Sequence, residues 1–317
     1  MVKIAFHDNC LCERGTTIAL FDYAFYNIKL LKNESIIMYN GADQRNIPEV
    51  LEKFKKEFKL CPYNNWDEVD NILEKNGVDI LYLIKGGDNE GKISLNKKNI
   101  IHCVFHTKDS HGDVYGKISS SIGDSHIPIV NHMVHLPNVN TNMRKKLGIP
   151  SDAIVFGRYG GFYEFNIECV HHIIDFITNE NNNIYFLFAN TNKFCNEKKN
   201  IIFLDKIIDL NEKSEFINTC DAMIHARLMG ETFGLSIAEF SIKNKPIITC
   251  HSGDKAHLNI LKDNCFIYND ANSLYNIFNH IYNNINYIIL KDWNMYKNYS
   301  PEIIMNEFNE KFITPCL

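Results

Sequence analysis

Two glutamates, Glu231 and Glu239, stand on either side of a point where the sequence predicts a strand, a short loop and then a helix. The helix is expected to begin near Leu235, directly after Gly234. The first turn of a helix offers unpaired backbone N–H groups and the positive end of the helix dipole, and a residue without a Cβ lets a phosphate approach them closely. Two carboxylates flanking such an anion site suit a ligand with a phosphate core and hydroxyls at both ends. A nucleotide-sugar has that chemistry, because ribose lies on one side of its diphosphate and a hexose on the other.

The segment from Glu231 to Glu239, Glu-Thr-Phe-Gly-Leu-Ser-Ile-Ala-Glu, resembles the E-x(7)-E signature of the retaining glycosyltransferases of glycosyltransferase family 4, which have the GT-B fold. Lys245-Pro-Ile-Ile matches the turn and strand that follow the signature helix. Arg144-Lys-Lys-Leu-Gly-Ile-Pro and the strand pattern after it resemble the linker helix and first strand of that family's donor domain. The resemblance covers roughly residues 136–250.

The resemblance implies an enzyme, a hexosyltransferase of glycan biosynthesis. It would move a hexosyl residue from a UDP-, GDP- or dTDP-sugar to a glycan, lipid or protein acceptor, with retention of configuration. No Asp-x-Asp motif lies in a plausible strand-end loop, so we expect no catalytic divalent metal. No cofactor is expected either, because the nucleotide-sugar is itself a substrate.

The resemblance also assigns roles to single residues. Glu231 would lie beside the donor sugar and act in catalysis, whereas Glu239 would bind the ribose hydroxyls. Arg158, after the first strand of the donor domain, would contact the diphosphate. Further donor contacts would come from the signature residues Phe233, Gly234 and Leu235.

The loop after Arg158 lacks the lysine that this family usually has a few residues later. Arg227 or Lys206, each close to a predicted strand end, could supply the missing positive charge. An alternative for Arg158 is an ordinary surface salt bridge, and for the two glutamates it is a pair of exposed acids near a helix start.

In the N-terminal half, Gly15 is the counterpart of a glycine loop that faces the phosphates in the family. His106, at the end of a predicted strand, resembles the family's histidine beside the donor, and we expect a catalytic role for it. His111 is a weaker candidate for an acceptor contact. His102 lies inside the same predicted strand and is expected in the core.

The elements that must position these residues follow from the apolar pattern. Short apolar segments alternate with amphipathic ones, which predicts βαβ units and parallel sheets covered by helices on both faces. In open α/β sheets, ligands bind beyond the carboxyl ends of the strands. Strands are predicted at 2–7, 35–39, 78–84, 100–106, 153–157, 184–188, 201–204, 222–225, 247–250 and 265–268, and helices at 16–31, 47–59, 143–147, 166–178, 211–220, 271–290 and 301–313.

A polar, turn-rich stretch at 136–142 separates two such series. The predicted fold class is therefore α/β, with two Rossmann-like doubly wound domains facing across a cleft (GT-B). The N-terminal acceptor domain is expected over 1–136 and the C-terminal nucleotide-sugar donor domain over 137–297. The last helix, within 298–317, is expected to pack back on the N-terminal domain.

Composition excludes some classes of function. The chain has 317 residues, with 33 Lys and Arg against 38 Asp and Glu and a formal net charge of −5. This balance argues against a nucleic-acid partner, and no apolar run reaches the ~18 residues of a membrane span. Ten cysteines without a C-x-x-C pair indicate reduced thiols in a cytoplasmic protein. The lysine-rich face of the helix at 47–59 is either solvated or a peripheral contact with an anionic membrane.

Two other functions fit part of the pattern. The missing lysine would suit a catalytically silent module that binds a sugar-nucleotide or a glycan, and the two-domain architecture would suit a nucleotide-sugar epimerase, although not with this glutamate signature. His7, Cys10 and Cys12 carry side chains that can bind metals, but the H-x(2)-C-x-C spacing lacks a second ligand pair. Packed thiols in a loop are the simpler interpretation, and no metal site is predicted.

Overall fold

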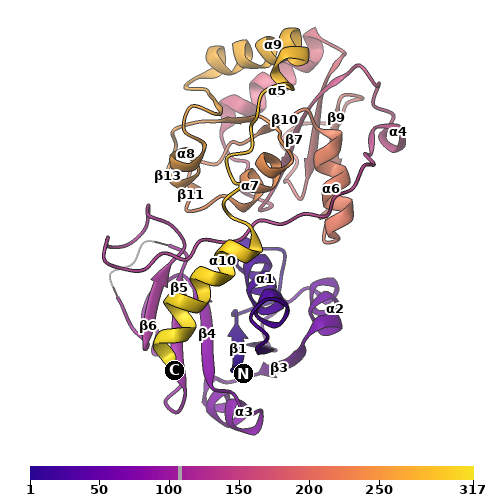
Figure 1. Cartoon of the computed structure of the whole chain (residues 1–317). Coiled ribbons are helices and arrows are strands. Elements are labelled where there is room, and N and C mark those ends of the chain that lie inside the picture. The colour runs from indigo at the N-terminus through magenta and orange to yellow at the C-terminus, as the bar shows by residue number, and fades with distance from the viewer. Residues whose placement is uncertain (106–108) are drawn as a thin grey trace. The chain divides into compact units, whose positions relative to one another are not determined.

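The polypeptide forms two α/β units and passes from the first to the second and back again (Figure 1). A computed structural model describes residues 1–105 and 109–317. Unit 1 consists of residues 1–133 and 299–317, and unit 2 consists of residues 134–298. His106, a predicted catalytic residue, lies outside the described residues.

The sheet of unit 1 has six parallel strands in the order β3-β2-β1-β4-β5-β6. This is the strand order of a Rossmann-like domain, with the reversal of direction between β1 and β4. The strands are β1 (Lys3–His7), β2 (Glu34–Asn40), β3 (Lys59–Tyr63), β4 (Ile80–Lys85), β5 (Lys98–Cys103) and β6 (Val114–Lys117).

Helices cover both faces of this sheet. On one face, Val69 and Leu73 of α3 pack against buried strand residues. On the other, Phe308 of α10 lies 5.4 Å from the ring of Tyr82 on β4, and Figure 1 shows α10 in yellow across this sheet. The helices of unit 1 are α1 (Gly15–Lys29), α2 (Pro48–Glu57), α3 (Val69–Lys75) and α10 (Pro301–Phe308). Short 3₁₀ helices lie at Trp66–Glu68 and Thr314–Cys316, and a short π-helix lies at Asn309–Ile313.

Unit 2 repeats this architecture. Its parallel sheet has the order β14-β12-β10-β7-β8-β9, which is again the Rossmann-like order when counted from β7. The strands are β7 (Ile154–Tyr159), β8 (Ile184–Ala189), β9 (Ile201–Leu204), β10 (Ala222–Ile224), β12 (Ile247–Thr249) and β14 (Phe266–Ile267), and a separate pair is formed by β11 (Gly230–Glu231) and β13 (Asp254–Lys255).

The core of unit 2 also lies on both faces of its sheet. One face packs Val170, Ile174 and Phe278 from α5 and α9 against the strands. On the other, Gly157 of β7 lets Cys220 approach so closely that a Cβ would be only 2.2 Å from the cysteine sulfur. The helices of unit 2 are α4 (Arg144–Leu147), α5 (Glu168–Glu180), α6 (Leu210–Thr219), α7 (Leu235–Ile242), α8 (Ala256–Leu261) and α9 (Ala271–Ile288).

Several predicted elements differ from the structure in their limits, and two examples lie in unit 1. The helix expected at 47–59 ends at Glu57, because the chain turns at Phe58 and Lys59 already belongs to β3. The strand expected at 100–106 ends at Cys103. Within residues 1–105 and 109–317, no helix is both long enough and apolar enough to cross a membrane.

Candidate functional site

Two of the predicted site residues follow the central strands of unit 2. Strand β7 pairs with β8 on one side and with β10 on the other, so the connections after β7 and β10 run in opposite directions across the sheet. In open α/β sheets, this is the point at which ligands bind. Arg158 lies near the end of β7, and Glu231 follows β10.

Gly234 shapes the start of α7. Its φ is +87°, a left-handed conformation that residues with a Cβ rarely adopt, and Leu235 is the first residue of the helix after it. A Cβ at this position would lie 3.4 Å from side-chain carbons of Glu231 and His257. Among the described residues, no side chain caps this helix. The N–H groups of its first turn can therefore serve an anionic ligand.

Glu231 is held by its backbone and by its carboxylate. Its backbone pairs with Lys255 between β11 and β13. His225 Nε2 lies 3.2 Å from Oε1, and Arg227 Nη1 donates to Oε2 at 3.1 Å. Burial acts to raise the pKa of Glu231, but the hydrogen bond from His225 and the positive charge of Arg227 act in the opposite direction, and the net pKa is lowered. Glu231 is therefore a carboxylate at neutral pH, able to accept hydrogen bonds but not to act as an acid.

A chain of hydrogen bonds behind Glu231 orients His225. Its Nδ1 lies 2.9 Å from Thr249 Oγ1, which in turn lies 3.1 Å from His257 Nε2. One assignment of protons satisfies every bond: His257 donates to Thr249, Thr249 to His225, and His225 to Glu231. Burial lowers the pKa of His257 to about 3, so its ring is neutral at neutral pH, and in this assignment its one proton lies on Nε2.

Arg227 is already engaged by two acidic side chains. It forms ion pairs with Glu231 and with Glu164, which precedes α5. Its charge is thus shared within the protein, and it orients Glu231 rather than standing free for a phosphate.

Arg158 is buried, with 5% of its surface exposed. Its guanidinium donates to the carbonyl oxygens of Asn190 and Gly161 at 3.0 and 2.7 Å and to the hydroxyl of Thr191, and it lies 5.6 Å from the ring of Phe165. Burial lowers its pKa to about 10, so it stays charged at neutral pH. No acidic side chain in the described part of the chain forms an ion pair with it. Glu231 and Glu164 act on this charge electrostatically, but it has no ion-pair partner among the described residues, and its burial suits an anionic ligand better than a surface salt bridge.

Glu239 lies one turn inside α7 and is 4% exposed. Its Oε1 accepts a hydrogen bond of 2.9 Å from Lys213 of α6, whose own side chain is 3% exposed. Burial acts to lower the pKa of Lys213, but Glu239 and Tyr159 outweigh it and raise the pKa. The other carboxylate oxygen, Oε2, is buried without a hydrogen-bond partner among the described residues. A buried acceptor in this state costs free energy unless a ligand donates to it.

The remaining predicted residues lie in varied surroundings. The Phe233 side chain is 2% exposed and packs against Tyr296, so it supports the loop from within the core. Lys206 is exposed after the edge strand β9, two strands away from β7. In unit 1, Gly15 is the exposed first residue of α1, and the His111 ring lies 3.4 Å from the Lys85 ammonium.

Sequence reasoning missed Lys213 and His225. A signal existed for Lys213, because it shares a helix face with Phe216 and Ile217, and a lysine among apolar residues needs a buried partner. His225 immediately follows the buried strand β10, a position that favours ligand and catalytic residues. In the described residues, no three His, Cys, Asp or Glu side chains are grouped as a metal site would require.

The chain is similar in structure to several solved proteins over almost its whole length. A glycosyltransferase from Rickettsia africae matches with a TM-score of 0.75 at 14% identity, covering 99% of this chain and 98% of its own. HepE of Anabaena in complex with UDP-glucose matches with a TM-score of 0.76 at 12% identity, covering 99% and 100%. WaaG, a glycosyltransferase involved in lipopolysaccharide biosynthesis, matches with a TM-score of 0.66 at 10% identity, covering 98% and 99%.

No protein-family model matches the sequence, and no curated protein matches it. The similarity is therefore one of structure, and it includes both six-stranded sheets. The predicted α/β fold class is confirmed: the chain has the GT-B fold of these glycosyltransferases, built from two Rossmann-like domains.

Proposed function

We propose that this chain is a glycosyltransferase that moves a hexosyl residue from a nucleotide-sugar to a glycan, lipid or protein acceptor. The observation that carries the proposal is Oε2 of Glu239, a buried acceptor on α7 that has no hydrogen-bond partner among the described residues, in the unit where strand direction reverses between β7 and β10. A ribose hydroxyl would supply the missing donor. The GT-B fold supports the same reading of the site.

In this proposal the diphosphate of the donor is bound by Arg158 and by the N–H groups at the start of α7. The bond from the anomeric carbon to the phosphate oxygen breaks, the sugar becomes oxocarbenium-like, and the leaving phosphate gains negative charge. Donors fixed in advance around that charge are the main source of catalysis, and the loss of one typically costs on the order of 10²–10³ in rate. Arg158 is already oriented by Asn190, Gly161 and Thr191, so little reorganisation is needed.

Glu231 has a different part in this reaction. As a carboxylate with a lowered pKa, it accepts hydrogen bonds from the donor sugar and stabilises positive charge at the anomeric centre. Following the resemblance to retaining enzymes, we assign the acceptor's proton to the leaving phosphate on the same face of the sugar. The positive groups that face the diphosphate are then protein groups, and we propose a reaction without metal.

The first experiment is a thermal-shift screen with UDP-, GDP- and dTDP-sugars. Donor binding raises stability by RT ln(1 + [L]/Kd), so the correct donor is the one that shifts the unfolding temperature. UDP-glucose is tested first because the HepE structure contains it. Product analysis then distinguishes the possible reactions: a new glycoside supports transfer, an epimerised nucleotide-sugar indicates an epimerase, and bound but unchanged donor indicates a silent binding module.

Glu231→Gln tests the catalytic assignment. We expect transfer to be abolished while nucleotide binding, measured by calorimetry, is retained. Glu168→Gln is the matched control, because Glu168 is an exposed glutamate in the first turn of α5 in the same unit. Turnover near the wild-type rate in the Glu231 variant would rule out its catalytic role.

A further inference from the structure

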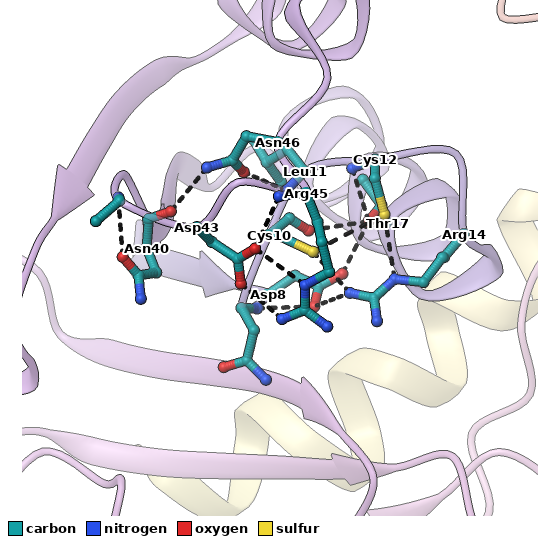
Figure 2. A network of polar contacts seen from close by, with 12 residues as sticks. Asp8, Cys10, Leu11, Cys12, Arg14, Thr17, Asn40, Asp43, Arg45 and Asn46 are labelled. Atoms are coloured by element: carbon teal, nitrogen blue, oxygen red, sulfur yellow. Dashed lines mark hydrogen bonds and ion pairs between the residues drawn. The ribbon is translucent and has the colours of Figure 1, made fainter.

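Two cysteines in unit 1 lie side by side immediately after β1 (Figure 2). The sulfurs of Cys10 and Cys12 are 3.9 Å apart, and the two residues are 0% and 6% exposed. Strand β1 lies next to β4, where the strand order of this sheet reverses. The pair therefore occupies the position in its sheet at which Rossmann-like domains place functional loops.

Arg14 contacts both sulfurs. Its Nη2 lies 2.9 Å from Cys10 Sγ and its Nε lies 3.1 Å from Cys12 Sγ, while about half of its side chain remains exposed. Figure 2 shows the guanidinium turned toward the two thiols. A cation in this position stabilises a thiolate, which is the reactive form of cysteine.

The electrostatic balance differs between the two thiols. The hydrogen bond from Cys10 and the nearby Arg14 lower the pKa of Cys12 to about 6, whereas the same hydrogen bond and burial raise the pKa of Cys10. The other charged groups of this network are Asp8, whose pKa is raised by burial, and Arg45, which is paired with a neighbouring aspartate. The pair thus combines a nucleophilic thiolate with an adjacent thiol.

Hydrogen bonds hold the backbone of the loop that carries the two cysteines. Leu11, the residue between them, donates its N–H to Asn46 Oδ1 and accepts at its carbonyl from Ile47 N, both at 2.9 Å. Thr17 donates to the Cys10 carbonyl at 3.2 Å. A disulfide bond is about 2.05 Å long, so the sulfurs must approach by about 1.9 Å.

We propose that Cys10 and Cys12 are a redox-active dithiol that a peroxide converts to an intramolecular disulfide. The Cys12 thiolate attacks one oxygen of hydrogen peroxide, the O–O bond breaks, and Cys12 becomes a sulfenic acid while hydroxide leaves. The Cys10 sulfur then attacks the Cys12 sulfur, the S–O bond breaks, and the proton of Cys10 passes to the departing hydroxide. Overall, two thiols and one peroxide give one disulfide and two waters.

Oxidation changes what Arg14 can bind. A disulfide carries no charge and accepts hydrogen bonds poorly, so the guanidinium loses both sulfur partners. Because Gly15, the residue after Arg14, begins α1, this change occurs directly beside the start of that helix. Any effect on sugar transfer rests on the proposed function, whereas formation of the disulfide does not.

Trypsin provides a direct test, because cleavage after Lys3 and Arg14 releases both cysteines in one peptide, residues 4–14. The full-length protein is treated with about one equivalent of hydrogen peroxide, alkylated with iodoacetamide after unfolding, digested and analysed by mass spectrometry. We expect the oxidised peptide to carry no alkyl group and to be lighter than the dithiol by two hydrogen atoms. Dithiothreitol should restore double alkylation. The assay contains no nucleotide or acceptor, so its result is independent of transferase activity.

Three results in the wild-type protein would overturn the proposal. The first is a doubly alkylated 4–14 peptide while other cysteine peptides are already oxidised. The second is a disulfide from Cys10 or Cys12 to another cysteine. The third is sulfinic acid on Cys12 without a disulfide at any peroxide concentration.

Single cysteine variants distinguish the roles of the two thiols in the reaction. Cys12→Ser should leave Cys10 unoxidised, and Cys10→Ser should stop at a sulfenic acid on Cys12 that dimedone traps. Cys265→Ser, which removes a partly exposed cysteine of unit 2, should leave the disulfide yield unchanged. Equal oxidation of the Cys10 and Cys12 single variants would contradict the assigned order of attack.

Arg14 is tested as a positioning residue. In Arg14→Met, the pH midpoint for alkylation of Cys12 in the folded protein should move up from about 6 toward the ordinary cysteine value of about 8.5. The tryptic peptide of this variant extends to Lys29. Arg14→Lys keeps a positive charge and should restore part of the shift. An unchanged midpoint in Arg14→Met would show that the guanidinium does not activate the thiol.

Discussion

The buried pair formed by Lys213 and Glu239 gives a prediction that separates stability from ligand binding. The two charges are 2.9 Å apart with side chains that are 3% and 6% exposed. Lys213→Met would leave the Glu239 carboxylate buried without its ion-pair partner. Removing one partner of such a pair typically costs ~3–5 kcal/mol, a large share of the ~5–15 kcal/mol that stabilises a domain. For a unit of this size, that corresponds to a fall of roughly 6–20 °C in the unfolding temperature.

The double variant Lys213→Met, Glu239→Leu removes both charges. Replacing a buried ion pair with apolar groups of similar volume is often neutral or stabilising, so most of the lost stability should return. Nucleotide binding should not return, because the acceptor for the ribose is gone. A hydrogen bond to a charged group contributes ~1.5–3 kcal/mol, so the affinity for the nucleoside diphosphate should fall roughly 10–150-fold.

Thermal unfolding and calorimetry with the nucleotide measure the two quantities. Lys98→Met is the matched control, because Lys98 and Asp113 form an ion pair of 2.8 Å in which the lysine is 56% exposed, and exposed pairs of this kind contribute little to stability. If Lys213→Met lowers the stability by no more than Lys98→Met does, the buried pair does not have the energetic role assigned to it. If the double variant binds the nucleotide as the wild type does, Glu239 Oε2 is not the ribose acceptor.

Two further predictions concern backbone strain and pH. Gly234→Ala should lose about 1–2 kcal/mol of stability, because the φ of +87° at this position is left-handed. It should also lower turnover, because a shift of this backbone displaces the N–H groups at the start of α7 that are proposed to bind the diphosphate. Gly148→Ala, with φ +66° and open space around it, should lose stability alone, and equal turnover in both variants would contradict this. His102 is fully buried, and burial lowers its pKa to about 3. As the pH falls, the unfolded chain therefore takes up a proton at this histidine before the folded protein does. Stability should fall as the pH drops from about 6.5 toward 3, by about 2 kcal/mol at pH 5. Urea unfolding at pH 7 and pH 5 checks this, and a His102→Gln variant whose pH dependence equals that of the wild type would refute it.

The sequence predicted most of the fold because its parallel strands are buried on both faces and therefore appear as continuous apolar runs. The prediction failed at the edge strands of the unit 1 sheet, β3 and β6. Strand β3 contains Pro62, which a central strand excludes but an edge strand tolerates, and the apolar spacing of Phe54 and Phe58 extended the preceding helix too far. Strand β6 is short, and Gly116 is required there because Phe312 approaches so closely that a Cβ would be 2.2 Å from its ring. That contact joins segments far apart in the chain, and local patterns cannot reveal it.

The candidate site was predictable only where its features are local in the sequence. The left-handed Gly234 and the helix start at Leu235 are local features, and the sequence carries them directly. The partners of the functional groups are not local. Lys213 reaches Glu239 from another helix. Of the three groups that orient Arg158, only Gly161 is close in sequence, whereas Asn190 and Thr191 come from the loop after β8.

The discontinuity of unit 1 affects how the protein is made on the ribosome. Residues 134–298 are continuous and can fold as they emerge, but the core of unit 1 needs Phe308 and Phe312, which pack on Tyr82 and His102. At a synthesis rate of about 5–20 residues per second, these rings arrive on the order of 10 s or more after the strands they cover. During that interval a nascent chain exposes apolar sheet surface, and chaperones that bind such surfaces have their longest opportunity on the N-terminal strands.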